Sequence, residues 1–258
     1  MESACNIFYG IYDNGCQSSV INDLLRRLDF HPLSITLLAT TASHNMWDHG
    51  RLLQEWRARR VQLLQTDYNE SLATTIELSL ASPTFHELGP DARNVLSVIA
   101  FFPQGIDENN LNWLFPTIPD RRNILDNLCA LSLTYRTGSF ITMLAPLRDY
   151  LRPKDPASPP LLCATKECYF SRLLVRVGPG EPGFEEARWI TSEDVNIEHL
   201  LDVFTTIDAG SSNVWDVCYH FMQHLLWHKR RLVVLGPNIE GLPDTHPSKP
   251  QCLFQLSQ

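Results

Sequence analysis

The chain has 258 residues, of which 44% are hydrophobic and 19% charged, and its formal net charge is -8 at pH 7. This composition is that of a folded protein of one or two domains, and it excludes a chain that is disordered along most of its length. The acidic balance argues against a nucleic-acid partner, because phosphate backbones are bound mainly through Lys and Arg. The 7 cysteines are scattered without CxxC spacing, so we expect reduced thiols. No run of about 18 uncharged apolar residues is present, so we expect a cytoplasmic protein with no membrane partner.

Residues 1–68 are predicted to form a helical bundle. An amphipathic helix is expected over 17–28, where one stripe holds Val20, Ile21, Leu24, Leu25 and Leu28. Pro32 interrupts this helix and suits the first turn of the next one. That next helix, 33–43, is apolar nearly all round, so we expect it at the centre of the bundle, with a third helix over 49–64 packed on it.

Residues 69–152 are predicted to form a winged helix. Helices are expected over 71–80, around 95–99, around 111–114 and around 124–128, with Asp107 and Asp120 as N-caps of the last two. The segments 131–135 and 140–143 are typical of strands, and Gly138 lies in the turn between them. Helices followed by a β-hairpin are the pattern of a winged helix.

Proline-rich residues 152–160 mark a boundary, after which we expect a linker with a helix over 153–195. This linker contains a helix over 161–177 and a GPGEPG break at 178–183. Helices over 197–207 and 214–228 suggest that 196–258 is a helical region leading into repeats. The last residues, CLFQLSQ, resemble the first turns of a helix, so we expect the chain to be a fragment or a truncated gene model.

Catalytic chemistry is not signalled by the sequence. No Gly-Lys pair is present, so a phosphate-binding loop is absent, and neither GxSxG nor HExxH occurs. His220, His224 and His228 share one helix face, but successive turns separate them by about 6 Å, so a polar helix face is favoured over a zinc site. Pro32 is the better candidate, because a proline that opens a buried helix forms a rigid corner on which a flat ring can pack, although a plain first-turn proline explains it equally well.

Several segments in order resemble the NB-ARC domains of fungal STAND and NLR-like proteins. FHPLSITLLA at 30–39 is similar to the GLPL element, AFFPQGI at 100–106 with WLFP at 113–116 to the start of the winged helix, and MLAPLRDY at 143–150 to the MHD region. RWITSEDVNIEHLLDVFTTID at 188–208 resembles the connector that leads into tetratricopeptide-type repeats. The resemblance implies a mainly α fold: an ARC-type helical bundle, a winged helix with a small β-hairpin, and the start of a helical-repeat region.

The resemblance also implies a function. Pro32 would pack near an adenine, whereas Ala145 stands where the family has the histidine that touches the ADP phosphate. Because the P-loop domain is missing, ADP or ATP binding is expected only together with that domain, and this chain is expected to have no cofactor, metal or catalytic residue of its own.

The expected role is the non-catalytic transmission portion of a nucleotide-switched signalling protein, with a full-length relative or a signalling effector as protein partner. Three alternatives remain open at this point: a winged-helix nucleic-acid-binding regulator, a metal-dependent enzyme built on the histidine face, and a truncated decoy that binds full-length relatives.

Overall fold

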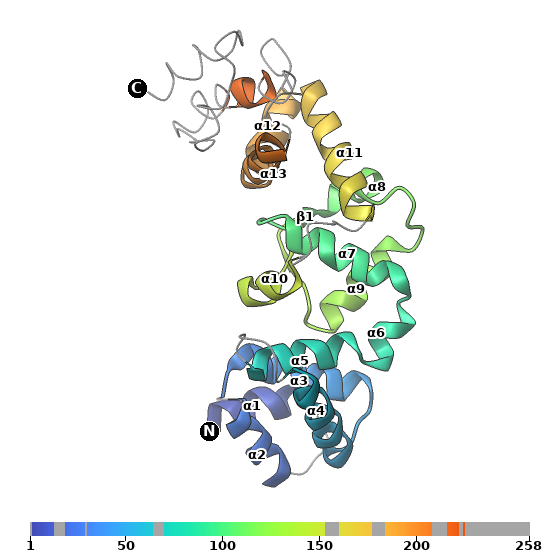
Figure 1. Cartoon of the computed structure of the whole chain (residues 1–258), viewed down its shortest axis with the longest axis vertical. Coiled ribbons are helices and arrows are strands. Elements are labelled where there is room, and N and C mark those ends of the chain that lie inside the picture. Colours follow the sequence, from blue (N-terminus) through green and yellow to red (C-terminus); the bar gives the residue numbers. More distant parts are fainter. Residues whose placement is uncertain are drawn as a thin grey trace. The chain divides into compact units, whose positions relative to one another are not determined.

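The computed structural model describes residues 2–12, 19–28, 30–63, 70–152, 160–176, 184–207, 216–221 and 224 (Figure 1). In this part of the chain the fold is mostly helical, with 77% of the residues in helices, and it contains a small three-stranded antiparallel sheet. This confirms the predicted mainly α class, while the ARC and winged-helix assignments stay predictions. The chain forms two compact units, which we call the N-terminal unit (1–100 and 116–156) and the C-terminal unit (101–115 and 157–258).

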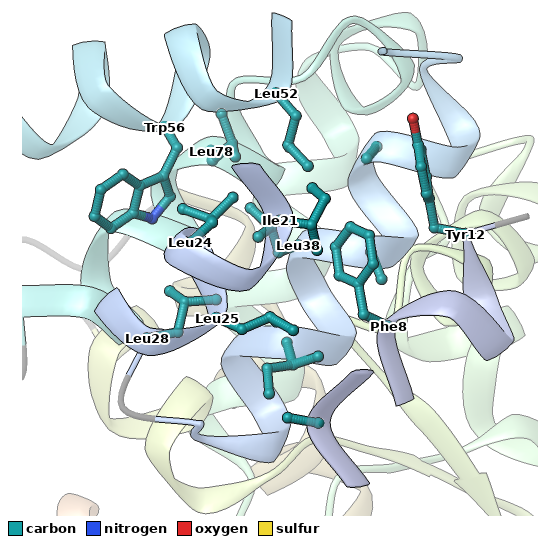
Figure 2. Packing of buried hydrophobic residues seen from close by; sticks show 14 of the residues in the cluster. Phe8, Tyr12, Ile21, Leu24, Leu25, Leu28, Leu38, Leu52, Trp56 and Leu78 are labelled. Carbon is teal, nitrogen blue, oxygen red and sulfur yellow. The ribbon is translucent and has the colours of Figure 1, made fainter. Parts of the chain in front are cut away.

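The first five helices of the N-terminal unit share one hydrophobic core. They are α1 (Glu2–Ile11), α2 (Ser19–Arg27), α3 (Pro32–His44), α4 (His49–Leu63) and α5 (Glu70–Leu80). Figure 2 shows this core, in which Phe8 of α1, Leu24 of α2, Leu38 of α3 and Trp56 of α4 are nearly or fully buried. Helices α2 to α5 lie close to the ranges that the apolar periodicity predicts, and α1 was not predicted.

Two helices, α3 and α5, are buried on almost every side and pack against each other. The central position predicted for α3 therefore holds, but α5 shares it. Hydroxyl groups join the two helices, since Thr41 Oγ1 lies 2.8 Å from Ser79 Oγ, and the Ser79 hydroxyl also donates to the carbonyl of Thr75. These buried hydroxyls are satisfied, as burial of a polar group requires.

The remaining elements of the N-terminal unit are α6 (Pro83–Glu87), α7 (Pro90–Phe101, whose last residue lies in the other unit), α9 (Arg121–Ala130), β2 (Tyr135–Thr137), β3 (Phe140–Thr142) and α10 (Ala145–Leu151). Strands β2 and β3 pair antiparallel, with Thr137 opposite Phe140. This pairing leaves Gly138 and Ser139 in the turn, where Gly138 has φ +61°, a value that glycine adopts without strain.

Two predictions for this region are wrong. The first strand begins at Tyr135 instead of Leu131, because Leu131 and Leu133 donate their amides back to carbonyls of α9 and so extend its C-terminal turn. Asp120 does precede α9, but its side chain makes no capping bond to the helix backbone. Its carboxylate accepts instead from Asn123 Nδ2 at 3.0 Å. Asp107 does cap a helical turn, because its Oδ1 accepts from the amide of Asn109 at 3.0 Å, but that turn is the 3₁₀ segment Glu108–Asn110. The helix predicted around 111–114 has Asn110 as its N-cap instead.

The C-terminal unit contains β1 (Ile106–Asp107), the 3₁₀ helix η1 (Glu108–Asn110), α8 (Leu111–Leu114), α11 (Pro160–Arg176), α12 (Phe184–Ser192) and α13 (Asp194–Ile207). Helix α8 packs against α11, as Figure 1 shows. Residues 216–221 are helical within the predicted helix 214–228. Of the break predicted at 152–160, residues 153–159 lie outside the described residues, as does the whole of the break predicted at 178–183. The four-part division at 68, 152 and 195 stays a prediction.

Candidate functional site

Pro32, the site residue that the sequence singles out, occupies the first turn of α3 and is exposed. The residue before it, His31, is the N-cap of the helix, and its Nδ1 accepts from the amide of Ser34 at 3.4 Å. The corner is therefore held by the cap on one side and by the buried body of α3 on the other. This geometry agrees with a rigid surface corner, and the packing of an adenine ring on Pro32 stays a prediction.

Ala145, at the place of the family's MHD histidine, is the exposed first residue of α10. Arg148, one turn further along, ties this helix to the hairpin. Its Nη2 donates to Thr142 Oγ1 and to the carbonyl of Met143, both at 3.2 Å. Burial lowers the pKa of the Arg148 guanidinium, and the nearby Tyr135 phenol opposes this shift. The start of α10 is thus fixed to β3 and to the residue that follows it.

The other end of α10 is tied to α5. Tyr150 donates its hydroxyl proton to Glu77 Oε1 at 2.6 Å. Burial, together with the hydrogen bond to Glu77, raises the pKa of the Tyr150 phenol, so it stays protonated as the donor, and Arg93 of α7 lies near enough to oppose that shift. Helix α10 therefore contacts the hairpin at one end and the central helix α5 at the other.

In the C-terminal unit, a buried carboxylate gathers several segments. Glu193 is the single residue between α12 and α13 and is 1% exposed. Its Oε1 accepts from Asn110 Nδ2 at 2.8 Å, and its Oε2 accepts from the Tyr169 hydroxyl and from Asn196 Nδ2, also at 2.8 Å each. Burial raises the pKa of the Glu193 carboxyl, and the hydrogen bonds from Asn196 and Tyr169 oppose that shift.

Asn196 and Ser192 extend this network to the turn at 102–105. Asn196 Oδ1 accepts from the amide of Gln104 at 3.0 Å, and its Nδ2 donates to the carbonyl of Gly105 at 2.9 Å. Gln104 Nε2 donates in turn to the carbonyl of Ser192 at 3.0 Å. Gly105 has φ +85°, a left-handed conformation that glycine adopts readily, so the turn presents its backbone to Asn196. We call Glu193, Asn196, Tyr169 and Asn110 the clamp.

Aromatic rings surround the clamp. Phe102 stacks on Tyr169 with ring centroids 5.1 Å apart, and Trp113 meets Tyr169 edge-on at 5.4 Å. Cations of α11 cover two rings of residues 101–115, with Lys166 Nζ 4.5 Å from the Phe101 centroid and Arg172 Cζ 4.5 Å from that of Trp113. Such cation–π contacts contribute about 0.5–1 kcal/mol each at partly exposed sites. Residues 101–115 are therefore held in the C-terminal unit by hydrogen bonds and by ring packing.

Of the three histidines predicted to share one helix face, the structure describes His220 and His224. His224 is buried, and its Nε2 lies 3.3 Å from Thr191 Oγ1, while His228 lies outside the described residues. No group of three or more potential metal ligands occurs in the part of the chain that the structure describes. Within the same residues, no helix is long and apolar enough to cross a membrane.

The clamp was missed by sequence reasoning. Glu193 lies in a charged stretch, TSEDVNIE, that is typical of a solvated helix start, and nothing in the sequence shows that the segment 101–115 packs against it. The available signal was weak: a Glu followed three residues later by Asn, a spacing at which side chains meet on one helix face.

The comparisons with known proteins provide no relative. No protein-family model, no curated protein and no solved structure matches the chain.

Proposed function

We propose that this chain is the non-catalytic transmission portion of a nucleotide-switched STAND or NLR-like signalling protein, which couples the nucleotide state of a P-loop domain to a helical-repeat sensor. The protein partner in this proposal is a full-length relative or a signalling effector, and the setting is cytoplasmic. The ordered resemblance of residues 30–39, 100–116 and 143–150 to that family supports this role.

One structural observation carries the proposal. Residues 101–115 belong to the C-terminal unit, although the residues on both sides of them belong to the N-terminal unit. The clamp holds this segment through Asn110 and the backbone of Gln104 and Gly105. A movement of the clamp is therefore passed through continuous backbone to α7 on one side and to Pro116 on the other.

In the N-terminal unit, three helices would respond to such a movement: α7, α10 and α5. Arg93 of α7 interacts electrostatically with Tyr150 of α10, and Tyr150 is bonded to Glu77 of α5. Helix α10 begins at Ala145, the place at which the resembled family senses ADP. Coupling between distant sites requires elements that respond together, and we propose that Arg93, Tyr150 and Glu77 connect α7, α10 and α5 in this way.

The proposal predicts that the chain transmits a conformational change but neither binds nor hydrolyses nucleotide by itself. Isothermal titration of ADP and of ATP into the purified chain should show no binding at micromolar nucleotide, and a coupled assay should show no ATP turnover. The coupling to a nucleotide-binding partner is tested by titration of ADP into a STAND-class P-loop domain with and without the chain. The chain should change the affinity of that domain for ADP. Micromolar ADP binding or ATP turnover by the chain alone would overturn the proposal.

A further inference from the structure

We propose that Glu193 makes the clamp sensitive to protons: the C-terminal unit holds residues 101–115 more firmly when Glu193 is protonated than when it is ionised. If protonation of Glu193 regulates the protein, it does so through the transmission role proposed above. The protonation step itself involves residues of the C-terminal unit alone.

Within the part of the chain that the structure describes, the Glu193 carboxylate is buried and its hydrogen-bond donors are neutral groups. Glu193 is 1% exposed, and the three groups that donate to it are two side-chain amides and a phenol. No cation pairs with Glu193 among the described ion pairs, which join Arg26 to Asp23 and Arg136 to Asp126. Burial of an ionised carboxylate without a cation is costly, and the usual response is uptake of a proton.

The charged groups packed around the clamp do not supply the missing cation. Asp107, which is 8% exposed, acts on Glu193 in the direction that favours protonation. Lys166 and Arg172 of α11 lie over the rings of Phe101 and Trp113 instead. Arg176 of α11 lies over the ring of Trp189, with its Cζ 4.7 Å from the centroid, and Arg188 of α12 is exposed. The other titratable groups on the elements around the clamp are Glu108 of η1, Cys163, Glu167 and Cys168 of α11, Glu185 and Glu186 of α12, and Asp194, Glu198, His199 and Asp202 of α13. The ring of His199 lies 4.9 Å from that of Phe101.

The sign of the proton linkage follows from the burial. The pKa of Glu193 is raised in the closed clamp, whereas in an opened clamp the carboxyl is exposed to water and titrates near its ordinary value of about 4.3. Closing therefore takes up a proton between those two pKa values. The stabilisation is fully present below the ordinary pKa, and it is lost as the pH rises through the raised one.

A direct test is a carbon-13 NMR titration of the glutamate carboxyls in the full chain, with the Glu193 signal assigned by its loss in Glu193→Gln. We expect Glu193 to titrate above the ordinary glutamate range. Glu167, which is exposed on the same unit, provides the control, through its signal and through the matched Glu167→Gln variant. A Glu193 signal that titrates at or below the ordinary value would overturn the proposal, because the three donors would then outweigh burial.

A second measurement needs no variant. Urea unfolding of the C-terminal unit, followed at pH values from 4 to 8, should show an equilibrium constant for closing that falls by about tenfold per pH unit inside the window between the two pKa values. A constant that is flat or rises with pH over this range contradicts a proton-stabilised clamp. Either failure would leave the relay standing, since the relay is tested separately by nucleotide titration and by exchange in α10.

Discussion

Removal of the Glu193 side chain is the perturbation from which the structure predicts the largest effect on the clamp. Glu193→Ala removes three buried hydrogen bonds, those from Asn110 Nδ2, Tyr169 OH and Asn196 Nδ2, and Asn196 Nδ2 keeps its second bond, to the carbonyl of Gly105. At about 1 kcal/mol for each hydrogen bond lost, we expect a loss of about 3 kcal/mol in the unfolding free energy of the C-terminal unit. Removal of a buried charge offsets part of this loss, so the value is an upper estimate.

The assay is urea unfolding followed by tryptophan fluorescence, because Trp113 and Trp189 both lie near Tyr169 in the C-terminal unit. Glu167→Ala removes an exposed carboxylate from the same unit and should change the unfolding free energy by less than about 0.5 kcal/mol. Glu193→Gln keeps an acceptor at the same place and should lose less than Glu193→Ala. If Glu193→Ala and Glu167→Ala unfold at the same urea concentration, the clamp does not stabilise the unit and the reasoning is wrong.

Three further changes probe the N-terminal unit by thermal and urea unfolding. Tyr150→Phe removes the hydrogen bond to Glu77 and should lower the unfolding free energy by about 1 kcal/mol. If the lost bond is the cause, Glu77→Gln should lower it by a similar amount, and the double variant should be little less stable than either single variant. Phe8→Ala opens a cavity in the first core, where Phe8 is 0% exposed, and should cost about 3–5 kcal/mol; a loss below 1 kcal/mol would show that α1 is not packed as described. Gly138→Ala places a Cβ at φ +61° and should cost about 1 kcal/mol through strain alone, because no atom lies within 4 Å of that Cβ, and Gly138→Asn should cost less.

The helices of the N-terminal unit could be predicted because their apolar stripes are strong. Ile21, Leu24 and Leu25 in one helix and the all-round apolar run of 33–43 define helices and their burial without knowledge of the neighbours. Short elements are harder to predict from the sequence. Helix α6 has five residues, and its N-cap Ser82 and first residue Pro83 are the only residues that indicate a helix there.

Buried polar groups account for the features that could not be predicted. Thr75 and Ser79 of α5 are fully buried, yet a hydroxyl in a sequence is as typical of an exposed face as of an interface between two helices. Glu193 is the extreme case, because its burial depends on Asn110, 83 positions earlier in the chain. Local periodicity contains no information about a partner at that separation.

Hydrogen exchange in α10 is the measurement that tests the relay most directly. Mass spectrometry of wild type, Glu193→Ala and Glu167→Ala would follow peptides from residues 101–115 and from Ala145–Leu151 under identical conditions. The relay predicts that Glu193→Ala speeds exchange in both segments and that Glu167→Ala does so in neither. Faster exchange confined to 101–115, with α10 unchanged, would mean that the clamp only stabilises its own unit, and the transmission role would be contradicted.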